Sequence, residues 1–544
     1  MQFLELYNHG KTAYHVEKKG ITVSQKKTSR SFIFGILMLG VTAFIATDAH
    51  AVILDWKGYF RADNNYVRNY QMDSAATGTA PAAGGEHIRG EGSKSATYTT
   101  FFAKFKPSAL INDNIIVHSE WNIGDPEFGF FGRGVPTVDR DIPTGSGRNS
   151  LGLDAARLWL DAHTDFGLVQ VGRAPMHWGL GVVFNSGDEP FDRYQTTMDT
   201  IRFISKFGYL SVMPLYAKSN VGKSLAGSRS AAATNTVTGG SDDVTDYGVG
   251  LKFHNPEDEL EAGFLFYKRN AGDQQDAFFY PHTAASPTKT QAAGANGMNL
   301  RLLDLYVKKT WYKLTLMGEM PYWSGTIGDV NGAGKRNEYK ATGFAAESRL
   351  DFDRWHHMLR FGLAPGQGSV TNGARGDKFG AMYFHRNYKL GQILFRYNLG
   401  GFGGNNPDDT STTAGNYANA TSPYDASIAN TKYLMFATEN KGEQWSWSLG
   451  VVYAKAQETA QAGKDFYIHR TRTYNGAAAV ESQSDSLGWE IDAGLGYNWD
   501  ENIRFGTDLG IFLPGEYWAF DNSITRSAKN DMVMALSFSA MAKF

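Results

Sequence analysis

The sequence predicts an all-β fold, an antiparallel β-barrel that spans a membrane with about 18 strands, in a range of about 16–20. Segments with a period of two follow one another from residue 52 to the end of the 544-residue chain. The connections between them alternate between short and long. Aromatic residues make up 14% of the chain, yet past residue 51 they never gather into a long apolar run. This combination is typical of strands that have one apolar and one polar face.

The C-terminal segment has a clear alternation. One parity is apolar and ends in an aromatic residue: Met534, Leu536, Phe538, Ala540, Ala542 and Phe544. The other parity is smaller and more polar. A terminal aromatic on the apolar face resembles the C-terminal signal of outer-membrane β-barrel proteins. The resemblance implies that this strand closes the barrel and that the barrel-assembly machinery binds Phe544. The alternative is an ordinary amphipathic terminal strand.

The N-terminal region predicts export. Lys26, Lys27 and Arg30 precede an apolar run at 32–45, and a small-x-small site follows at 49–51. That order is typical of a secretory signal peptide, and we expect cleavage after Ala51. The run is short for a membrane-spanning helix, although an N-terminal membrane anchor remains the alternative. We therefore expect residues 1–51 to be an N-terminal extension with a cleaved signal peptide, and residues 52–544 to form the barrel.

The alternating segments occur as hairpins around short polar turns. Eight hairpins, together with a first strand at 54–69 and the terminal strand, make 18 strands. A ninth hairpin at 380–399 would make 20. The hairpins span 100–124, 153–174, 200–216, 246–268, 300–323, 340–364, 432–454 and 487–512.

Long connections rich in Gly, Ser, Ala, Asn and Asp separate the hairpins. Short turns on one side and long loops on the other are typical of outer-membrane barrels, whose periplasmic turns are short and whose extracellular loops are long. An even strand number places both ends of the barrel on the periplasmic side. The long connections lie near 70–96, 125–150, 175–199, 219–243, 270–297, 325–338, 366–378, 401–430, 456–486 and 513–528.

Alternation also predicts which side chains face the lumen. Glu490 and Asp492 alternate with Trp489 and Ile491, and two carboxylates cannot face hydrocarbon cheaply. In a soluble protein the same charges would face outside water, so the alternation alone leaves both cases open. Tryptophans near the strand ends predict two aromatic belts: Trp311, Trp355, Trp445 and Trp499 at the short turns, and Trp121, Trp178, Trp323 and Trp518 near the long loops.

The segment 156–173 resembles a hairpin of general porins. A Phe166-Gly167 turn is followed by an alternating strand that ends in Gly172-Arg173. In that family the next loop folds into the lumen and narrows it, which here implies a constriction loop at 175–199. The residues after Gly172-Arg173 depart from the family's pattern, since they contain a Trp178-Gly179 element.

A constriction acts through acidic loop groups that oppose basic wall groups across a narrow aqueous gap. The resemblance points to the loop residues Asp188, Glu189, Asp192 and Arg193, and Arg157 is the wall residue that we expect to complete this site. Each of them could instead be an ordinary solvated residue of a wide lumen. Further wall candidates are Arg61, Lys104, Arg301, Arg349, Arg360, Arg396 and Arg504.

Hydrolytic and metal-binding functions have less support from the sequence. An outer-membrane hydrolase would need a nucleophile beside a histidine, and no Gly-x-Ser-x-Gly segment accompanies His118, His163, His177 or His254. His356 and His357 are adjacent on a strand and point to opposite faces, so we expect no metal there. Acidic loop pieces at 242–243 and 405–409 are more typical of solvated loops than of a Ca²⁺ site.

The sequence thus predicts a non-enzymatic outer-membrane porin that passes small hydrophilic solutes or ions by passive diffusion. Its expected partners are outer-membrane lipid, the permeating solutes and the barrel-assembly machinery. A homotrimer is left open, no cofactor is expected, and a net charge of −2 suggests no nucleic acid. The alternatives are an outer-membrane hydrolase and a surface receptor or structural barrel with an occluded lumen.

Overall fold

A computed structural model describes most of the predicted barrel. The described residues are 53–70, 72, 95–124, 153–220, 244–271, 297–328, 331, 335–371, 375–397, 399, 426–469, 473–475, 477–520, 522 and 530–544. The predicted signal peptide at 1–51 and the acidic pieces at 242–243 and 405–409 lie outside these residues. No helix in the described part of the chain has the length and apolar character needed to cross a membrane.

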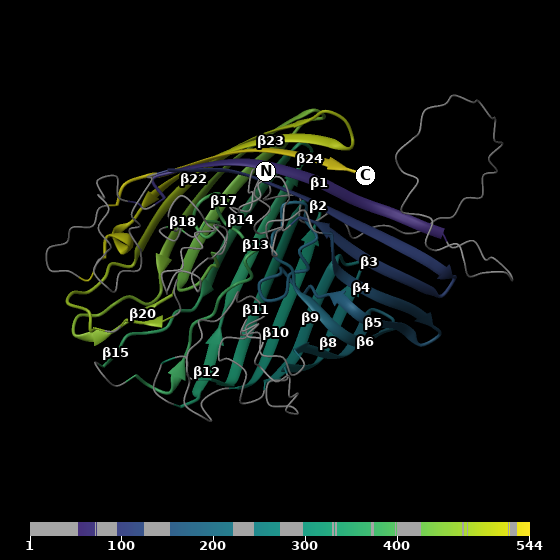
Figure 1. Cartoon of the computed structure of the whole chain (residues 1–544), viewed down its shortest axis with the longest axis horizontal. Coiled ribbons are helices and arrows are strands. Elements are labelled where there is room, and N and C mark those ends of the chain that lie inside the picture. The colour runs from purple at the N-terminus through teal and green to yellow at the C-terminus, as the bar shows by residue number, and fades with distance from the viewer. Residues whose placement is uncertain are drawn as a thin grey trace, which may run out of the picture.

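Eighteen antiparallel strands close one barrel within the described residues, which confirms the predicted fold class (Figure 1). Strand β1 pairs with β24 from Tyr59↔Lys543 to Arg68↔Met534, and this pairing closes the sheet. The strands are β1 (Ile53–Arg68), β2 (Ser95–Asn112), β3 (Ile115–Ile123), β4 (Leu153–Thr164), β5 (Gly167–Pro175), β6 (Thr197–Phe207), β7 (Leu210–Asn220), β8 (Val244–Asn255), β9 (Leu260–Ala271), β10 (Met298–Trp311), β11 (Leu314–Ile327), β12 (Asn337–Thr342) with β13 (Phe344–Phe352), β14 (Trp355–Ala364), β17 (Thr431–Lys441), β18 (Trp445–Ala456), β22 (Ser486–Asn498), β23 (Ile503–Pro514) and β24 (Val533–Lys543).

Strands β12 and β13 count as one barrel strand, because both pair with β11 on either side of Gly343. Smaller elements lie in the long connections between barrel strands. They are β15 (Val370–Thr371), β16 (Lys378–Phe379), β19 (Lys464–Asp465), β20 (Tyr467–Ile468), β21 (Thr473–Tyr474) and the 3₁₀ helix η2 (Glu516–Ala519). The eight predicted hairpins, the first strand and the terminal strand are all present.

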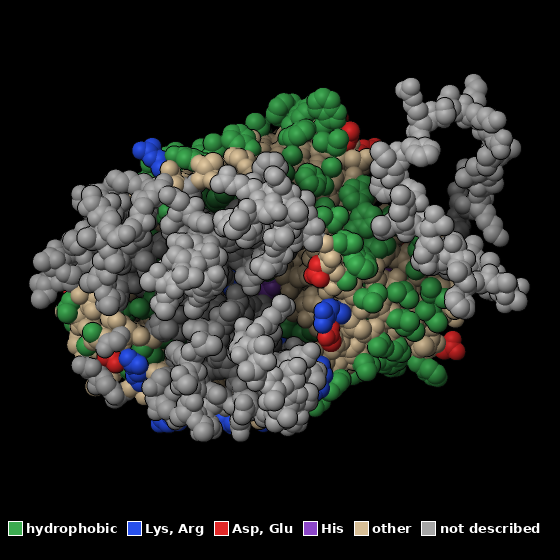
Figure 2. Space-filling view, in the orientation of Figure 1, with side chains coloured by type: hydrophobic (Ala, Val, Ile, Leu, Met, Phe, Trp, Pro, Cys, Tyr) green, Lys and Arg blue, Asp and Glu red, His purple; other side chains and the backbone are tan. Residues whose placement is uncertain are grey.

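The two faces of the strands follow the predicted parity. Trp489 and Ile491 on β22 are 50% and 45% exposed, whereas Glu490 and Asp492 are 0% and 6% exposed. Figure 2 shows hydrophobic side chains gathered on the outer surface, over β23, β24 and β1 at the top and over β3–β6 at the right. An apolar outer face around a lumen lined with buried charges is the arrangement that a bilayer requires of a barrel.

Of the two predicted tryptophan belts, the one at the short turns is correct and the one near the long loops is partly wrong. Trp311, Trp355, Trp445 and Trp499 are exposed beside the short turns. Trp178 and Trp323, expected near the long-loop rim, are instead 0% and 3% exposed. Both belong to the hydrophobic cluster inside the barrel, because the lumen contains enough chain to bury them.

Two chain segments fill that lumen. The first, residues 176–196, connects β5 to β6. The second, residues 380–397, follows β16, and the hairpin predicted at 380–399 is wrong, because these residues form no strand pair. Its backbone donors do not form a ladder with a neighbouring strand: Met382 N donates to Pro365 O and Phe384 N to Ile428 O, both at 2.9 Å. We call these the first and second inward segments.

Candidate functional site

The first inward segment forms a narrow loop whose tip contacts the wall at strands β1, β2 and β4. Its two arms are joined by a hydrogen bond from Thr196 N to Asn185 O at 2.7 Å. Gly187 has a φ of +67°, and a Cβ at this position would collide with the backbone oxygen of Tyr194. A residue without a Cβ therefore allows the chain to turn back tightly here. The turn leaves residues 188–193 at the tip.

Arg157 on β4 joins the loop to the wall. Its guanidinium lies 3.0 Å from the carboxylate of Glu120 on β3 and also donates to the backbone oxygen of Ser186. Lys104 on β2 lies 2.8 Å from the same carboxylate and donates to Gly187 O at 3.1 Å. Arg157, Glu120 and Lys104 are at most 3% exposed. Such a buried charge network needs every member paired, since an unpaired buried charge is costly.

Asp188 continues the network toward the lumen. Its carboxylate lies 2.9 Å from Lys106 and 3.4 Å from Arg157. Burial raises the pKa of Asp188, but the charges of Lys106 and Arg157 outweigh this effect and hold that pKa well below its usual value. Asp188 therefore remains a carboxylate at physiological pH.

The rest of the tip is held by two arginines, one that donates to backbone oxygens and one that forms an ion pair. Arg61 on β1 donates to Pro190 O at 2.6 Å and to Asp192 O at 2.7 Å. Arg193 lies 2.6 Å from the carboxylate of Asp63. The Asp192 carboxylate accepts from Glu189 N at 3.2 Å. Burial and the neighbouring charge of Glu189 raise the pKa of Asp192 to about 7.

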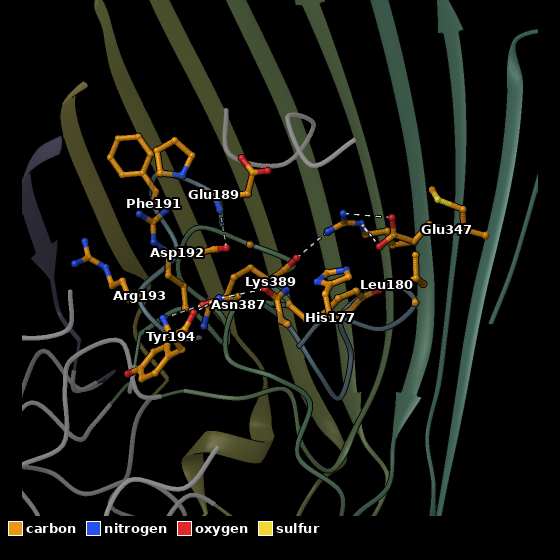
Figure 3. A pocket seen from close by; sticks show the side chains of 18 of the residues that line it. His177, Leu180, Glu189, Phe191, Asp192, Arg193, Tyr194, Glu347, Asn387 and Lys389 are labelled. Carbon is orange, nitrogen blue, oxygen red and sulfur yellow. Dashed lines mark hydrogen bonds and ion pairs between the residues drawn. The ribbon is translucent and has the colours of Figure 1, made fainter. Parts of the chain in front are cut away.

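A cavity lined by charged groups, called the passage below, lies between this tip, the second inward segment and the wall. It encloses about 1250 Å³, including its part open to solvent. Figure 3 shows Glu189, Phe191 and Asp192 on one side and Glu347 on the strand wall at the other. The basic side chains that line it include Arg193 from the first segment, Lys389 and Arg396 from the second, and Arg349 and Arg360 from the wall. Acidic groups of the tip and basic groups of the wall and of the second segment thus line the same cavity.

The predicted site residues come together, with three exceptions among the wall candidates. Arg301 is on the outward parity, because Leu300 and Leu302 are the buried residues of β10. Arg396 belongs to the second inward segment and not to the wall. Arg61, Lys104, Arg157, Arg349 and Arg360 lie on the lumen face as predicted, and Arg504 lies near the short turns.

Sequence reasoning missed the contribution of the second inward segment. Lys389 donates to Phe395 O at 2.9 Å, and its own backbone oxygen accepts from Arg360 at 2.9 Å. Arg360 also lies 3.0 Å from Glu347, so wall and segment are joined through one guanidinium. The alternating pattern of 380–399 carries no signal for this role, because it is equally consistent with a strand.

The described residues contain no group of three or more potential metal-binding side chains. His356 lies 2.7 Å from Asp351, whereas His357 stacks on Trp355 with centroids 6.0 Å apart. The two histidines therefore make separate contacts, as their adjacent positions on a strand predict.

The barrel itself confirms the predicted porin-like β-barrel fold: it is closed, antiparallel, apolar outside and charged inside. No protein-family model and no curated protein matches the chain. Among solved structures it is similar to a BenF-like porin from Pseudomonas fluorescens Pf-5, with 9% identity, 90% of this chain and 99% of that chain covered, and a TM-score of 0.44.

Two further similar structures are OccAB3 of Acinetobacter baumannii and OccK2 (OpdF) of Pseudomonas aeruginosa in complex with glucuronate. OccAB3 is 10% identical over 90% of this chain and 100% of that chain, with a TM-score of 0.44. OccK2 is 9% identical over 90% of this chain and 97% of that chain, with a TM-score of 0.42. Identities of this size carry no information about the solute.

Proposed function

We propose that the chain is an outer-membrane porin through which small hydrophilic solutes diffuse passively. The observation that carries the proposal is the inward loop 176–196, which brings Asp188, Glu189 and Asp192 close to basic groups inside a closed barrel. An apolar outer face suits lipid, and a charged gap suits hydrated solutes. The barrel's location in the outer membrane, its cleaved signal peptide and the constriction role of these residues are parts of the same proposal.

The mechanism needs no reacting group. Glu189 and Asp192 carry the acidic side of the passage, and Arg349, Lys389 and Arg396 carry its basic side. A solute that enters the gap exchanges part of its hydration shell for these groups, and the field across the gap orients its dipole. The sizes of the two inward segments limit which solutes fit. Selectivity then follows from charge and size together.

The deciding experiment is single-channel conductance of refolded residues 52–544 in a planar bilayer. An open porin gives stable ohmic steps, and steps in groups of three support a homotrimer. A barrel that migrates as folded protein before heating but stays electrically silent contradicts the porin proposal. That outcome would favour the receptor or structural barrel with an occluded lumen. Membrane fractionation and N-terminal mass spectrometry of the native protein test its location and cleavage after Ala51.

A hydrolase is a second candidate, and one specific observation favours it. Ser108 Oγ lies 2.9 Å from His118 Nδ1, and His118 Nε2 lies 3.3 Å from Asp161. Gln170 donates to the other Asp161 oxygen at 2.8 Å. These residues meet across strands β2–β5 near the short turns. Serine, histidine and aspartate in hydrogen-bond reach are the components of a hydrolytic triad.

We infer that this group is a hydrogen-bond network of the lumen and that the chain is not an enzyme. Neighbouring strands bring polar lumen residues into register without any catalytic requirement, as Ser108 and His118 are direct cross-strand partners. A fluorophosphonate probe tests the point, because it labels an activated serine covalently. Labelling that disappears in Ser108→Ala and persists in the control Ser119→Ala would overturn the inference.

A further inference from the structure

Besides the contacts described above, each inward segment is joined to the barrel wall by a buried glutamate that accepts hydrogen bonds from its backbone. On β11, Glu319 Oε2 accepts hydrogen bonds from Leu180 N and from Val182 N, the latter at 3.4 Å. Both donors belong to the first inward segment. Glu319 is 1% exposed, so this contact lies fully inside the barrel.

A second glutamate makes the equivalent contact on another part of the wall. On β22, the two carboxylate oxygens of Glu490 accept from Ile393 N at 2.6 Å and from Leu394 N at 2.7 Å. Its neighbour Asp492 accepts from Gln392 N at 3.3 Å. Three consecutive backbone donors of the second inward segment therefore point at two wall carboxyl groups. Backbone N–H groups that converge in this way form a binding concavity for an anion.

Glycines allow both contacts. A Cβ on Gly179 would lie 2.5 Å from Glu319 Oε2, and a Cβ on Gly391 would lie 2.5 Å from the carboxyl group of Glu490. Any larger residue would push the segment away from the wall. The two positions thus combine a buried carboxyl group with a backbone that approaches it closely.

The segments are also joined to each other beside the passage. His385 N donates to Val182 O at 2.7 Å, and the Asn387 side chain donates to Tyr194 O at 2.6 Å. Leu180 and Gly391, next to the two glutamate contacts, line the passage itself. A displacement of either segment from its glutamate therefore changes the width of the gap.

We propose that Glu319 and Glu490 are positioning residues that set the width of the passage by holding the two inward segments against the wall. The proposal rests on the porin function proposed above. A glutamate that served barrel stability alone would not need to contact the inward segments. Burial of a carboxyl group is costly, and here its hydrogen-bonding capacity is directed at backbone donors of the constriction.

The first test compares Glu490→Gln with the control Glu439→Gln. Glu439 is also a buried lumen glutamate, 1% exposed, and its ion-pair partner is Lys441 on its own strand. Glutamine keeps the size of the side chain, but its amide nitrogen opposes one of the backbone donors. We expect Glu490→Gln to raise single-channel conductance roughly twofold and Glu439→Gln to leave it unchanged. Heat-modifiable migration on gels verifies that each variant folds.

The second test uses a disulfide that can be formed and reduced within one variant, with wild type as the control. The chain contains no cysteine, so Gly391→Cys with Glu490→Cys introduces the only thiol pair. The short distance between the Gly391 Cβ position and the Glu490 side chain brings two sulfur atoms within reach. The oxidised variant should conduct like wild type, and a reductant should raise its conductance while wild type does not respond.

The outcomes separate this proposal from the porin function. A conducting wild type with unchanged conductance in Glu490→Gln and in the reduced cysteine pair overturns the positioning role and leaves the porin function intact. A silent, folded wild type overturns the porin function and the positioning role with it. An increase in Glu490→Gln and in the reduced pair, with Glu439→Gln like wild type, supports the proposal.

Discussion

The carboxylate of Asp188 lies 2.9 Å from the ammonium group of Lys106, which joins the tip of an inward loop to strand β2 of the barrel wall. Asp188 carries its charge throughout the physiological range, because Lys106 and Arg157 hold its pKa low against the effect of burial. Its neighbours Glu189 and Asp192 line the passage. The tip therefore places acidic groups at the passage, which we propose is the constriction.

Removal of that charge should change ion selectivity. In the triple variant Asp188→Asn, Glu189→Gln, Asp192→Asn, the basic groups of the passage face no opposing tip charge. We expect the cation-to-anion permeability ratio to fall about threefold, because the remaining field favours anions. Reversal potentials in a salt gradient measure this ratio. Asp165→Asn, at a short turn outside the passage, serves as the control, and equal potentials in wild type and triple variant would refute the constriction role.

Selectivity should also depend on pH through Asp192. Its pKa of about 7, raised by burial and by the charge of Glu189, means that the side chain is mostly neutral below pH 7 and mostly negative above it. The preference for cations should therefore increase as pH rises from about 6 to about 8. His177 also lines the passage, but burial and the charge of Lys252 lower its pKa, which moves its titration toward lower pH and away from that of Asp192.

Reversal potentials across this pH range test the dependence, with Asp192→Asn as the matched variant. The substitution keeps the size of the side chain and removes its titration. We expect the variant's selectivity to be nearly constant between pH 6 and 8. If Asp192→Asn keeps the wild-type pH dependence, another group is responsible and the assignment to Asp192 is wrong.

The terminal residue should affect assembly rather than conduction. Phe544 packs over Gly58 on β1, where a Cβ would lie 2.5 Å from its ring, and its ring centroid is 5.5 Å from that of Phe105. Backbone hydrogen bonds of 2.9 and 3.1 Å also join Phe544 to Gly58. We expect Phe544→Ala to reduce the amount of folded barrel in the outer membrane, because it removes both the closing contact and the predicted assembly signal.

The matched control is Phe538→Ala, on the same outward face of β24 and 51% exposed, against 57% for Phe544. Folded and unfolded forms are quantified by heat-modifiable migration of membrane fractions. The conductance of those channels that do assemble should match wild type in both variants. Equal folded amounts in the two variants would show that the last position has no special role.

The sequence predicted the strands well because a bilayer imposes a simple pattern. On β22, two carboxyl groups alternate with large apolar residues, and only one orientation keeps Glu490 and Asp492 out of hydrocarbon. Short turns then fix the register of each hairpin. Arg157 and Asp188 were expected to belong to one constriction, and they do form an ion pair at 3.4 Å, but the constriction role itself stays a prediction.

The errors arise where the lumen face is itself apolar. On β10, Leu300 and Leu302 are buried against the inward segments, while Leu303 and Leu305 face outward. Both parities are therefore apolar, and polarity cannot decide the direction of Arg301. The segment 380–399 was expected to be a hairpin, because its alternating pattern is equally consistent with a strand. Its backbone donors are satisfied by Glu490 and Asp492, about a hundred residues away, which no local pattern can indicate.

The last prediction concerns Arg157 as the junction between loop and wall. Arg157→Ala removes its contacts with Glu120, Ser186 O and Asp188 at once. Loss of one partner from a buried ion pair costs about 3–5 kcal/mol. Here we expect a loss of about 2 kcal/mol in the free energy of unfolding, because Lys104 still pairs with Glu120. The released loop should also make the open channel noisier.

Arg173→Ala is the matched control, because Arg173 pairs with Asp199 at 2.7 Å while both side chains are about half exposed. An exposed ion pair contributes only about 0–1 kcal/mol, so unfolding and open-channel noise should change little. Arg157→Lys should fall between the two, since lysine keeps the charge but cannot bridge three partners in one plane. Unfolding in urea with lipid vesicles and bilayer recordings measure both quantities. Equal losses for Arg157→Ala and Arg173→Ala would mean that the buried network does not hold the loop.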